Sequence, residues 1–235
     1  MYKNRKILAV IPARGGSKGI PDKNIIEINN RPLIDYTISE ALNSQYIDKI
    51  IVSTDSEKIA NIAKKCGADV PFLRPKHLAE DHSKTIDVLI DLIKQLSKNG
   101  EEYNYLLLLQ PTQPLRRTFH IDEAIKIIIE NNYKSLLSVN EVSEHPVLIR
   151  SIHKDGRLKN LLSINSTVRR QDFESYYKVN GAIYINLLDE DFNADTSLND
   201  NIYPYIMDKE YDLDIDEPFD LEIFKLKLHL NNKLK

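Results

Sequence analysis

"LAVIPARGGSKGIPDKN" (Leu8–Asn24) begins with an apolar run and continues as a glycine-rich loop. Three of the seven glycines in the 235-residue chain, Gly15, Gly16 and Gly19, lie in this loop. Glycine costs conformational entropy, so a cluster of glycines indicates a backbone that turns sharply or approaches another group closely. The loop also carries cations, namely Arg14, Lys18 and Lys23. The stretch therefore predicts a buried strand followed by a loop that binds an anionic ligand.

Composition limits the kinds of partner. The formal net charge is −3, so we expect no bulk attraction to nucleic acid, and a positive field for an anion must be local. No apolar stretch approaches the roughly 20 residues of a membrane span, and Ile7–Ile11 is too short for a signal sequence. The single cysteine, Cys66, precludes an intramolecular disulfide, and we expect a cytoplasmic protein.

Short apolar runs without alternation recur along the chain, as in strands that are covered on both faces of a parallel sheet. They are Lys6–Ile11, Lys49–Ser53, Tyr105–Leu109, Ser135–Val142 and Ala182–Ile185. Segments with helical periodicity separate these runs. We expect one helix after Pro32, one after a capping box at Thr54-x-x-Glu57, one over Ile86–Leu96 and one over Ile121–Ile129. This order predicts an α/β fold with a doubly wound, mostly parallel sheet, whose ligands bind beyond the carboxyl ends of the strands.

The rhythm of strands and helices divides the chain into three parts. Residues 1–143 form the first α/β part, and residues 180–235 complete it. Between them, residues 144–179 are polar and basic without a clean period, and they contain a turn at Lys154-Asp155-Gly156. We interpret this part as a small insertion that includes a hairpin.

Several motifs compete for the glycine loop. Gly15-Gly16-Ser17-Lys18-Gly19 formally matches G-x-S-x-G, the nucleophile elbow of serine hydrolases, although that elbow usually follows a later strand. The glycine spacings of Walker and dinucleotide-binding loops are not met. A surface turn with incidental cations is a further alternative. We favour a phosphate cradle, in which backbone N–H groups bind a nucleoside triphosphate together with Arg14 and Lys23.

Near the end of the chain, Asp212–Asp216 alternates three carboxylates with Leu213 and Ile215. In an extended chain the carboxylates share one face and the aliphatic pair shares the other. Carboxylate oxygens suit a hard cation such as Mg²⁺, which also keeps waters and binds substrate phosphates. Taken alone, the pattern favours a half-buried strand with a solvated acidic face. We interpret the helix expected next, over Glu217–Leu230, as core packing.

The opening loop resembles the signature loop of the N-acylneuraminate cytidylyltransferases, the CMP-sialic acid synthetases. Their pattern is an apolar strand, Ala-Arg, two variable residues, Ser-Lys and, a few residues later, Lys-Asn. Further matches follow in order: IVSTD (51–55), LRP (73–75), LAED (78–81), LQPTQPLR (109–116), RRQ (169–171), NGAIYI (180–185) and LDID (213–216). The resemblance spans nearly the whole chain and implies a Rossmann-like nucleotidyltransferase fold, with a nucleotide-binding first part and a dimerising insertion.

The resemblance implies an enzyme that joins CTP to a nine-carbon 2-keto sugar acid and releases pyrophosphate. It implies catalytic roles for Arg14, Lys23, Asp214 and Asp216, the last two holding Mg²⁺ or Mn²⁺. It implies nucleotide contacts from Ala13, Arg14, Gly15, Gly16, Ser17, Lys23, Asn24 and Arg74, and sugar contacts from Gln110, Arg170, Lys178 and Asn180. Because the insertion of family members reaches the partner's site, we expect a homodimer, with no nucleic-acid or membrane partner.

Two departures from the family pattern leave the sugar open. Lys178 stands where the family commonly has arginine, and Gln113 replaces a serine, so sialic, legionaminic and pseudaminic acids all stay candidates. The nearest alternative is a 3-deoxy-manno-octulosonate cytidylyltransferase, against which the RRQ and NGAIYI segments argue. A serine hydrolase using Ser17 is the alternative from another enzyme class. A binding protein that senses nucleotide without catalysis is the non-enzymatic one, and the intact Asp214-x-Asp216 pair argues against it.

Overall fold

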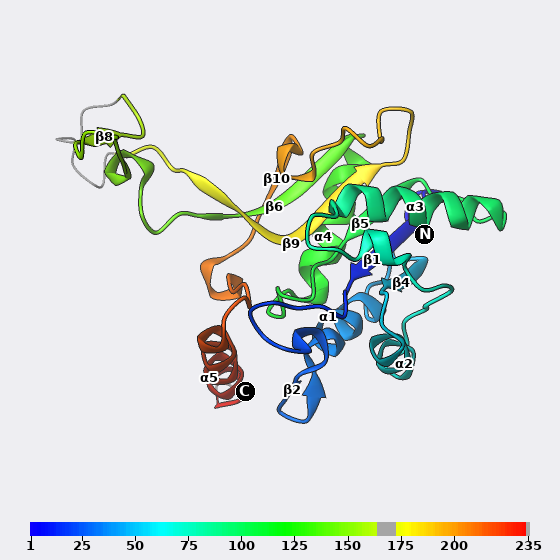
Figure 1. The fold of residues 1–235 in the computed structure, drawn as a ribbon. Helices are drawn as coiled ribbons and strands as arrows, with labels where there is room; N and C mark the ends of the chain where they lie inside the picture. The colour runs from blue at the N-terminus through cyan, green and yellow to red at the C-terminus, as the bar shows by residue number, and fades with distance from the viewer. Residues whose placement is uncertain (164–172, 234–235) are drawn as a thin grey trace.

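A six-stranded sheet forms the centre of the computed structural model, which describes residues 1–163 and 173–233 (Figure 1). The strand order is β10-β6-β9-β5-β1-β4. The bounds are β1 Ile7–Pro12, β4 Lys49–Ser53, β5 Tyr105–Leu108, β6 Ser135–Glu141, β9 Tyr177–Leu187 and β10 Tyr203–Ile206. β1 is parallel to β4 and β5, and β6 is parallel to β10, whereas β9 is antiparallel to both of its neighbours. The prediction of a mostly parallel sheet is confirmed.

Helices cover both faces of the sheet. Alternate residues of β1 point to opposite sides, so each face presents apolar side chains against which helices pack. Ile7, Ala9 and Ile11 belong to a buried cluster with α1, α2 and α4. Leu8 and Val10 belong to a second cluster on the other face, against α3. The fold is therefore doubly wound, as predicted. The helix bounds are α1 Leu33–Leu42, α2 Glu57–Lys65, α3 Thr85–Lys98, α4 Thr118–Glu130 and α5 Pro218–Lys233.

The strand order reverses at β1. The chain passes from β1 to β4 on one side and later returns to β5 on the other side. At such a point the loops that leave the two central strands diverge and border a crevice. β1 ends at Pro12 and β5 ends at Leu108, so the glycine loop and the stretch that begins at Leu109 meet at the same edge of the sheet.

A third buried cluster fastens the end of the chain to the glycine loop. Ile215 has no exposed surface, and its N–H donates to the carbonyl of Thr112 at 2.9 Å. Asp214 and Asp216 on the opposite face are exposed, which confirms the alternation expected over Asp212–Asp216. The segment is extended and precedes α5. The cluster comprises Ile20, Ile28, Leu33, Tyr36, Leu115, Leu213, Ile215, Leu221 and Phe224.

The start of α2 corrects one prediction. The cap is Ser56, whose Oγ accepts from the N–H of Ile59 at 3.4 Å, and the expected Thr54-x-x-Glu57 box does not form. Thr54 is completely buried, and its hydroxyl accepts from the N–H of Ser56 at 3.1 Å, so it holds the strand end instead of the helix. Gly67, with a φ of +97°, follows the helix, as glycine does after many helices.

The structure adds short strands to those expected. β10 contains Pro204, which is tolerated because the strand lies at the sheet edge, but which interrupts any apolar run in the sequence. β2 (Glu27–Ile28) and β3 (Arg31–Pro32) form a small hairpin after the glycine loop. None of the helices in the described ranges combines the length and apolarity needed to cross a membrane.

Within the predicted insertion, β7 (Arg150–Ile152) and β8 (Leu158–Asn160) pair in an antiparallel hairpin. Its turn contains Gly156 at a φ of +81°, as expected for the Lys-Asp-Gly sequence. In Figure 1 the hairpin lies far from the sheet, at the end of the long arm that continues into β9. Arg170, predicted to contact sugar, lies outside the described residues.

Candidate functional site

A cavity of about 400 Å³ opens at the carboxyl ends of β1 and β5. Its walls come from three places in the chain: the glycine loop, the stretch after β5, and the acidic stretch before α5. Seven of the predicted site residues line it together, namely Arg14, Ser17, Lys23, Asn24, Gln110, Asp214 and Asp216. The fold therefore brings cations and carboxylates from the two ends of the chain to face one hollow.

Lys23 joins the glycine loop to the acidic stretch. Its Nζ donates to the carbonyl of Ile215 at 2.8 Å and to Oδ1 of Asp216 at 2.9 Å. Only 14% of the Lys23 side chain is exposed, and an ammonium in such a place needs fixed partners. Gly19 lets the same segments approach, because a Cβ built there would lie 2.4 Å from the carbonyl oxygen of Asp216.

The backbone of the glycine loop is held by bonds that point away from the cavity. The N–H of Ala13 donates to the carbonyl of Ser53, and the N–H of Gly15 donates to Asp55, both at 2.9 Å. Ala13 and Gly15 lie outside the lining of the cavity, and so does Gly16. Their nucleotide contacts stay predictions.

Asn24 is almost buried and lines the cavity, and its amide donates to the carbonyl of Arg14 at 3.1 Å. A second hollow, of about 300 Å³, adjoins the cavity across Pro12 and Arg14 and is lined by Arg74. Arg74 is 9% exposed, and its guanidinium donates to the Ser53 carbonyl at 2.6 Å, which ties the second hollow to the end of β4. Burial lowers the pKa of the Arg74 guanidinium from its ordinary value.

Asp214 and Asp216 form the acidic wall. Part of Asp214 is open to solvent, yet its carboxyl lies against protein, and the lost solvation, together with the negative charge of Asp216, raises its pKa. The side chain of Asp220 accepts from the N–H groups of Asp216 at 2.9 Å and Glu217 at 2.8 Å. The first turn of α5 therefore fixes the backbone that presents Asp216.

The acidic wall fits the predicted divalent cation. Across residues 1–163 and 173–233, no three His, Cys, Asp or Glu side chains are grouped closely enough to hold a metal ion. Two carboxylates on one wall are the protein donors that Mg²⁺ uses when water and substrate phosphates complete its coordination. Asp214 and Asp216 therefore supply a donor set for a cation that arrives with a phosphate ligand.

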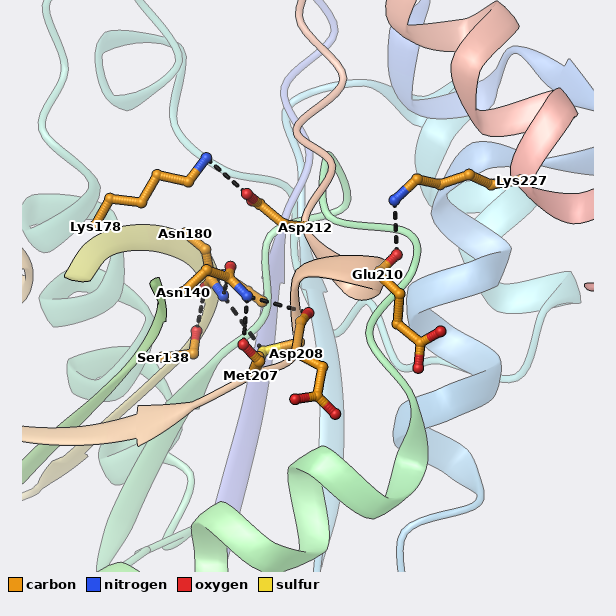
Figure 2. Close-up of polar contacts among 10 residues, drawn as sticks. Ser138, Asn140, Lys178, Asn180, Met207, Asp208, Glu210, Asp212 and Lys227 are labelled. Carbon is orange, nitrogen blue, oxygen red and sulfur yellow. Dashed lines mark hydrogen bonds and ion pairs between the residues drawn. The ribbon is translucent and has the colours of Figure 1, made fainter. Parts of the chain in front are cut away.

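Figure 2 shows the surroundings of two residues predicted to contact sugar. Lys178 pairs with Asp212 of its own chain at 2.7 Å. Asn180 is buried; its Oδ1 accepts from Ser138 Oγ at 2.5 Å, and its Nδ2 donates to Asn140 at 2.6 Å. These bonds fill the irregular part of the β6–β9 ladder. Neither residue lines the cavity, and their sugar contacts stay predictions.

Gln110 lies at the cavity because Gly181 leaves room for it. Gly181 has a φ of +77°, and a Cβ there would lie 2.6 Å from Oε1 of Gln110. Sequence reasoning missed the residue beneath this site, Arg116, which is 1% exposed and donates to the Ala182 carbonyl at 2.7 Å and to Thr37 Oγ1 at 2.8 Å. Its place at the end of LQPTQPLR was the available signal.

Ser17 lines the cavity, but its surroundings differ from a nucleophile elbow. The elbow requires a strand that turns directly into a helix, with the serine at the turn. Here the chain passes from β1 through a 3₁₀ turn at Lys23–Ile25 to the β2–β3 hairpin before α1 begins. The G-x-S-x-G match is therefore formal, and Ser17 belongs to a loop among cations.

The cavity lies where a doubly wound sheet binds its ligands, and its cationic loop opposite paired carboxylates suits a phosphate ligand with a divalent cation. Residues 8–230 match the family model described as Cytidylyltransferase. The chain belongs to this cytidylyltransferase family, and the resemblance inferred from its motifs is confirmed.

Individual relatives agree with the family match. A "CMP-N,N'-diacetyllegionaminic acid synthase" of Legionella pneumophila is 37% identical over 235 residues, which cover 97% of this chain and 98% of the relative. An "N-acylneuraminate cytidylyltransferase" of Streptococcus agalactiae serotype V is 35% identical over 213 residues, which cover 90% of this chain. The match covers 50% of that streptococcal protein, so this chain spans about half of its length.

Among solved structures, a CMP:2-keto-3-deoxy-manno-octonic acid synthetase complexed with CTP superposes with a TM-score of 0.72. The superposition covers 96% of this chain and 99% of the other, at 16% sequence identity. An identity this low shows a shared fold, and the Rossmann-like α/β architecture is thereby confirmed.

The contact between Gly19 and Asp216 yields a stability prediction. We expect Gly19→Ala to lower the free energy of unfolding by about 1–3 kcal/mol, because the added methyl forces two backbone segments apart. Gly16→Ala is the matched control; a Cβ there meets nothing within 4 Å, and we expect a change within about 0.5 kcal/mol. Urea denaturation of the two variants checks this, and equal stabilities would contradict the close approach.

Proposed function

We propose that the protein transfers the cytidylyl group of CTP to a nonulosonic acid, giving the CMP-sugar and pyrophosphate. The observation that carries the proposal is the cavity in which Arg14 and Lys23 face Asp214 and Asp216. A nucleoside triphosphate carries close to four negative charges, and this cavity gathers cations in a chain whose net charge is −3. The names of the two relatives support both CTP and this class of acid.

The proposed roles follow from position. Transfer of a phosphoryl-type group demands mainly positioning and neutralisation of charge. Arg14 and Lys23 would bind the triphosphate and stabilise the charge that grows on the leaving pyrophosphate. Asn24 and Arg74 would contact the nucleotide at the adjoining walls. Mg²⁺, or Mn²⁺ in its place, would be held by Asp214 and Asp216 and would supply positive charge to the phosphates.

The sugar acid would bind next to Gln110, whose amide can accept from or donate to hydroxyl groups. Arg170 is the proposed partner of the sugar carboxylate, since a guanidinium pairs with a carboxylate through two parallel bonds. Lys178 is proposed as a second cation from the base of the same arm. The identity of the acid is the part of the proposal that an assay has to supply.

The assay incubates the protein with Mg²⁺, one nucleoside triphosphate and one acid, and measures pyrophosphate. We expect release with CTP and one of sialic, legionaminic or pseudaminic acid, and none with ATP or GTP. Release with 3-deoxy-manno-octulosonate instead would favour the smaller-sugar alternative. Absence of release with CTP and every acid would contradict the proposal. Labelling of Ser17 by a serine-directed acylating reagent would favour the hydrolase.

Asp214→Asn separates the proposed metal role from stability. The folded protein raises the pKa of Asp214, so this carboxyl resists ionisation in the folded state. As pH rises through the ordinary pKa of an aspartate toward the raised one, ionisation therefore costs stability, and the cost remains at higher pH. We therefore expect the variant to unfold at an equal or higher temperature at neutral pH. Its turnover should fall by more than the roughly 10–100-fold that losing an outer partner of a metal site costs.

Glu217→Gln is the control for Asp214→Asn, because it removes one charge from an exposed position three residues further along the chain. We expect it to keep turnover close to that of the wild type. Pyrophosphate release and thermal unfolding are measured on both variants. Turnover of Asp214→Asn at the wild-type rate would refute the metal role.

We also propose that the protein is a homodimer that pairs through the insertion. The hairpin and its flanks expose Leu148, Ile149, Ile152, Leu158 and Leu161, with Ile152 77% and Leu158 70% exposed. Exposed apolar patches of this kind mark interaction sites in soluble proteins. The arm carries them away from the body of the molecule, where a second copy can cover them (Figure 1).

The dimer proposal is tested by light scattering during size-exclusion chromatography. We expect the wild type to elute with the mass of two chains, and Ile152→Asp combined with Leu158→Asp to elute with the mass of one. Phe219→Asp is the control, because Phe219 is 71% exposed on α5, in another part of the molecule. A double variant that keeps the dimer mass would exclude the hairpin as the interface.

We further propose a cytoplasmic location. Cys66 is a free thiol, and burial raises its pKa to about 11, which keeps it protonated and weakly reactive. A chain with one unpaired cysteine suits a reducing compartment, where CTP is also present as a substrate. Fractionation of the native cells checks this location.

A further inference from the structure

Asp81 makes two ion pairs with the glycine loop. Its Oδ1 accepts from Nη1 of Arg14 at 2.8 Å, and its Oδ2 lies 2.7 Å from Nζ of Lys18. Each carboxylate oxygen therefore engages one cation, and one carboxylate bridges both. Arg14 lines both hollows, and Asp81 lines the second one, so this bridge lies between them.

The bridge differs from the other charged contacts of the site. Lys23 and Arg74 are largely buried and are held partly by backbone carbonyls, which cannot leave. Asp81, by contrast, has 52% of its side chain exposed, and Lys18 has 73%. Exposed ion pairs contribute little to stability, so these partners can exchange at small cost.

The segment that carries Asp81 is a turn between two short elements. It follows the 3₁₀ turn Lys76–Leu78 and precedes α3. A side-chain bond from Ser83 to the His77 carbonyl at 2.8 Å holds the base of this turn. Asp81 itself can therefore rotate away from the loop cations while the turn keeps its place.

We propose that Asp81 is a displaceable counter-ion, which competes with polyphosphate for Arg14 and Lys18. A phosphate group offers oxygen atoms to a guanidinium and an ammonium in the same way as this carboxylate does. Both anions cannot share the two cations, because like charges at such distances repel. Asp81 therefore weakens the binding of triphosphate and takes the cations back as pyrophosphate leaves.

The proposal rests on the phosphate-binding role of the loop, and the test uses pyrophosphate alone, in metal-free buffer. Its dissociation constant is measured by calorimetry on the full chain. We expect Asp81→Asn, which keeps the shape of the side chain, to bind pyrophosphate about 3- to 10-fold more tightly, the scale of two exposed ion pairs. The gain should shrink as salt is added, because salt screens exposed charges.

Glu80→Gln is the matched control. Glu80 precedes Asp81 and also lines the second hollow, but its carboxylate lies 3.4 Å from His82 and not against a loop cation. The control removes the same charge from the same turn, and we expect it to change the dissociation constant less than about twofold. Equal gains from both variants would reduce the effect to bulk charge and overturn the proposal.

A second cycle tests the partner. In a Lys18→Gln background, Asp81→Asn should tighten pyrophosphate binding less than it does in the wild type, because one of the two cations for which Asp81 competes has been removed. Weaker pyrophosphate binding by Asp81→Asn would show that Asp81 organises the loop for the ligand, and would overturn the proposal. Thermal unfolding verifies that each variant is folded.

The outcomes separate this inference from the proposed function. If every variant binds pyrophosphate and Asp81→Asn tightens binding no more than Glu80→Gln does, the counter-ion role of Asp81 is refuted and the proposed cytidylyl transfer is unaffected. If Asp81→Asn gains as expected but CTP is not turned over, the counter-ion stands and the proposed reaction fails. If no form binds pyrophosphate in metal-free buffer, the counter-ion is refuted, and the CTP assay with Mg²⁺ decides the proposed reaction.

Discussion

The ammonium of Lys23, held by the Ile215 carbonyl and the Asp216 carboxylate, is the contact on which the site depends. It joins a loop that begins 12 residues into the chain to a segment that begins some 200 residues later. This contact sets the register between the wall that carries the cations and the wall that carries the carboxylates. A polyanion with a bound divalent cation needs both walls at one distance from each other.

Packing, and not charge, supplies the energy that keeps these walls together. Ile215 and Phe224 are completely buried, and each side chain of this size stabilises the fold by about 1.5–3 kcal/mol when removed from water. Exposed ion pairs contribute about 0–1 kcal/mol. The buried cluster around Ile215 therefore holds the acidic stretch in place, and the polar contacts of Lys23 and the Thr112 carbonyl set its register.

Local pattern explains which features the sequence could predict. β1 and the alternation at Asp214 and Asp216 were predictable, because burial on both faces or on one face leaves a direct record in neighbouring residues. The prediction that Thr54 caps α2 was wrong. Thr54 and Ser56 can both cap a helix, and only the tertiary fold decides which of the two hydroxyls is buried.

Long-range contacts leave no such record. Ser138, Asn140 and Asn180 look like ordinary strand residues in sequence, and their role appears only where the β6–β9 ladder becomes irregular. Arg116 is the last residue of LQPTQPLR, and only the fold shows that it is buried, with its guanidinium donating to the Ala182 carbonyl. The same holds for Asp81, since the LAED segment gives no indication that its carboxylate reaches the glycine loop.

The cations of the site divide into two kinds according to what holds them. Backbone carbonyls hold Lys23 and Arg74, and a carbonyl keeps its place whatever ligand arrives, so these two charges act as fixed points. Arg14 and Lys18 share one exposed carboxylate, which a phosphate can replace. Fixed charges give a ligand its orientation, and exchangeable ones limit how tightly a product is held. In the proposed reaction, a protein of net negative charge thereby concentrates positive field for the triphosphate and still releases pyrophosphate.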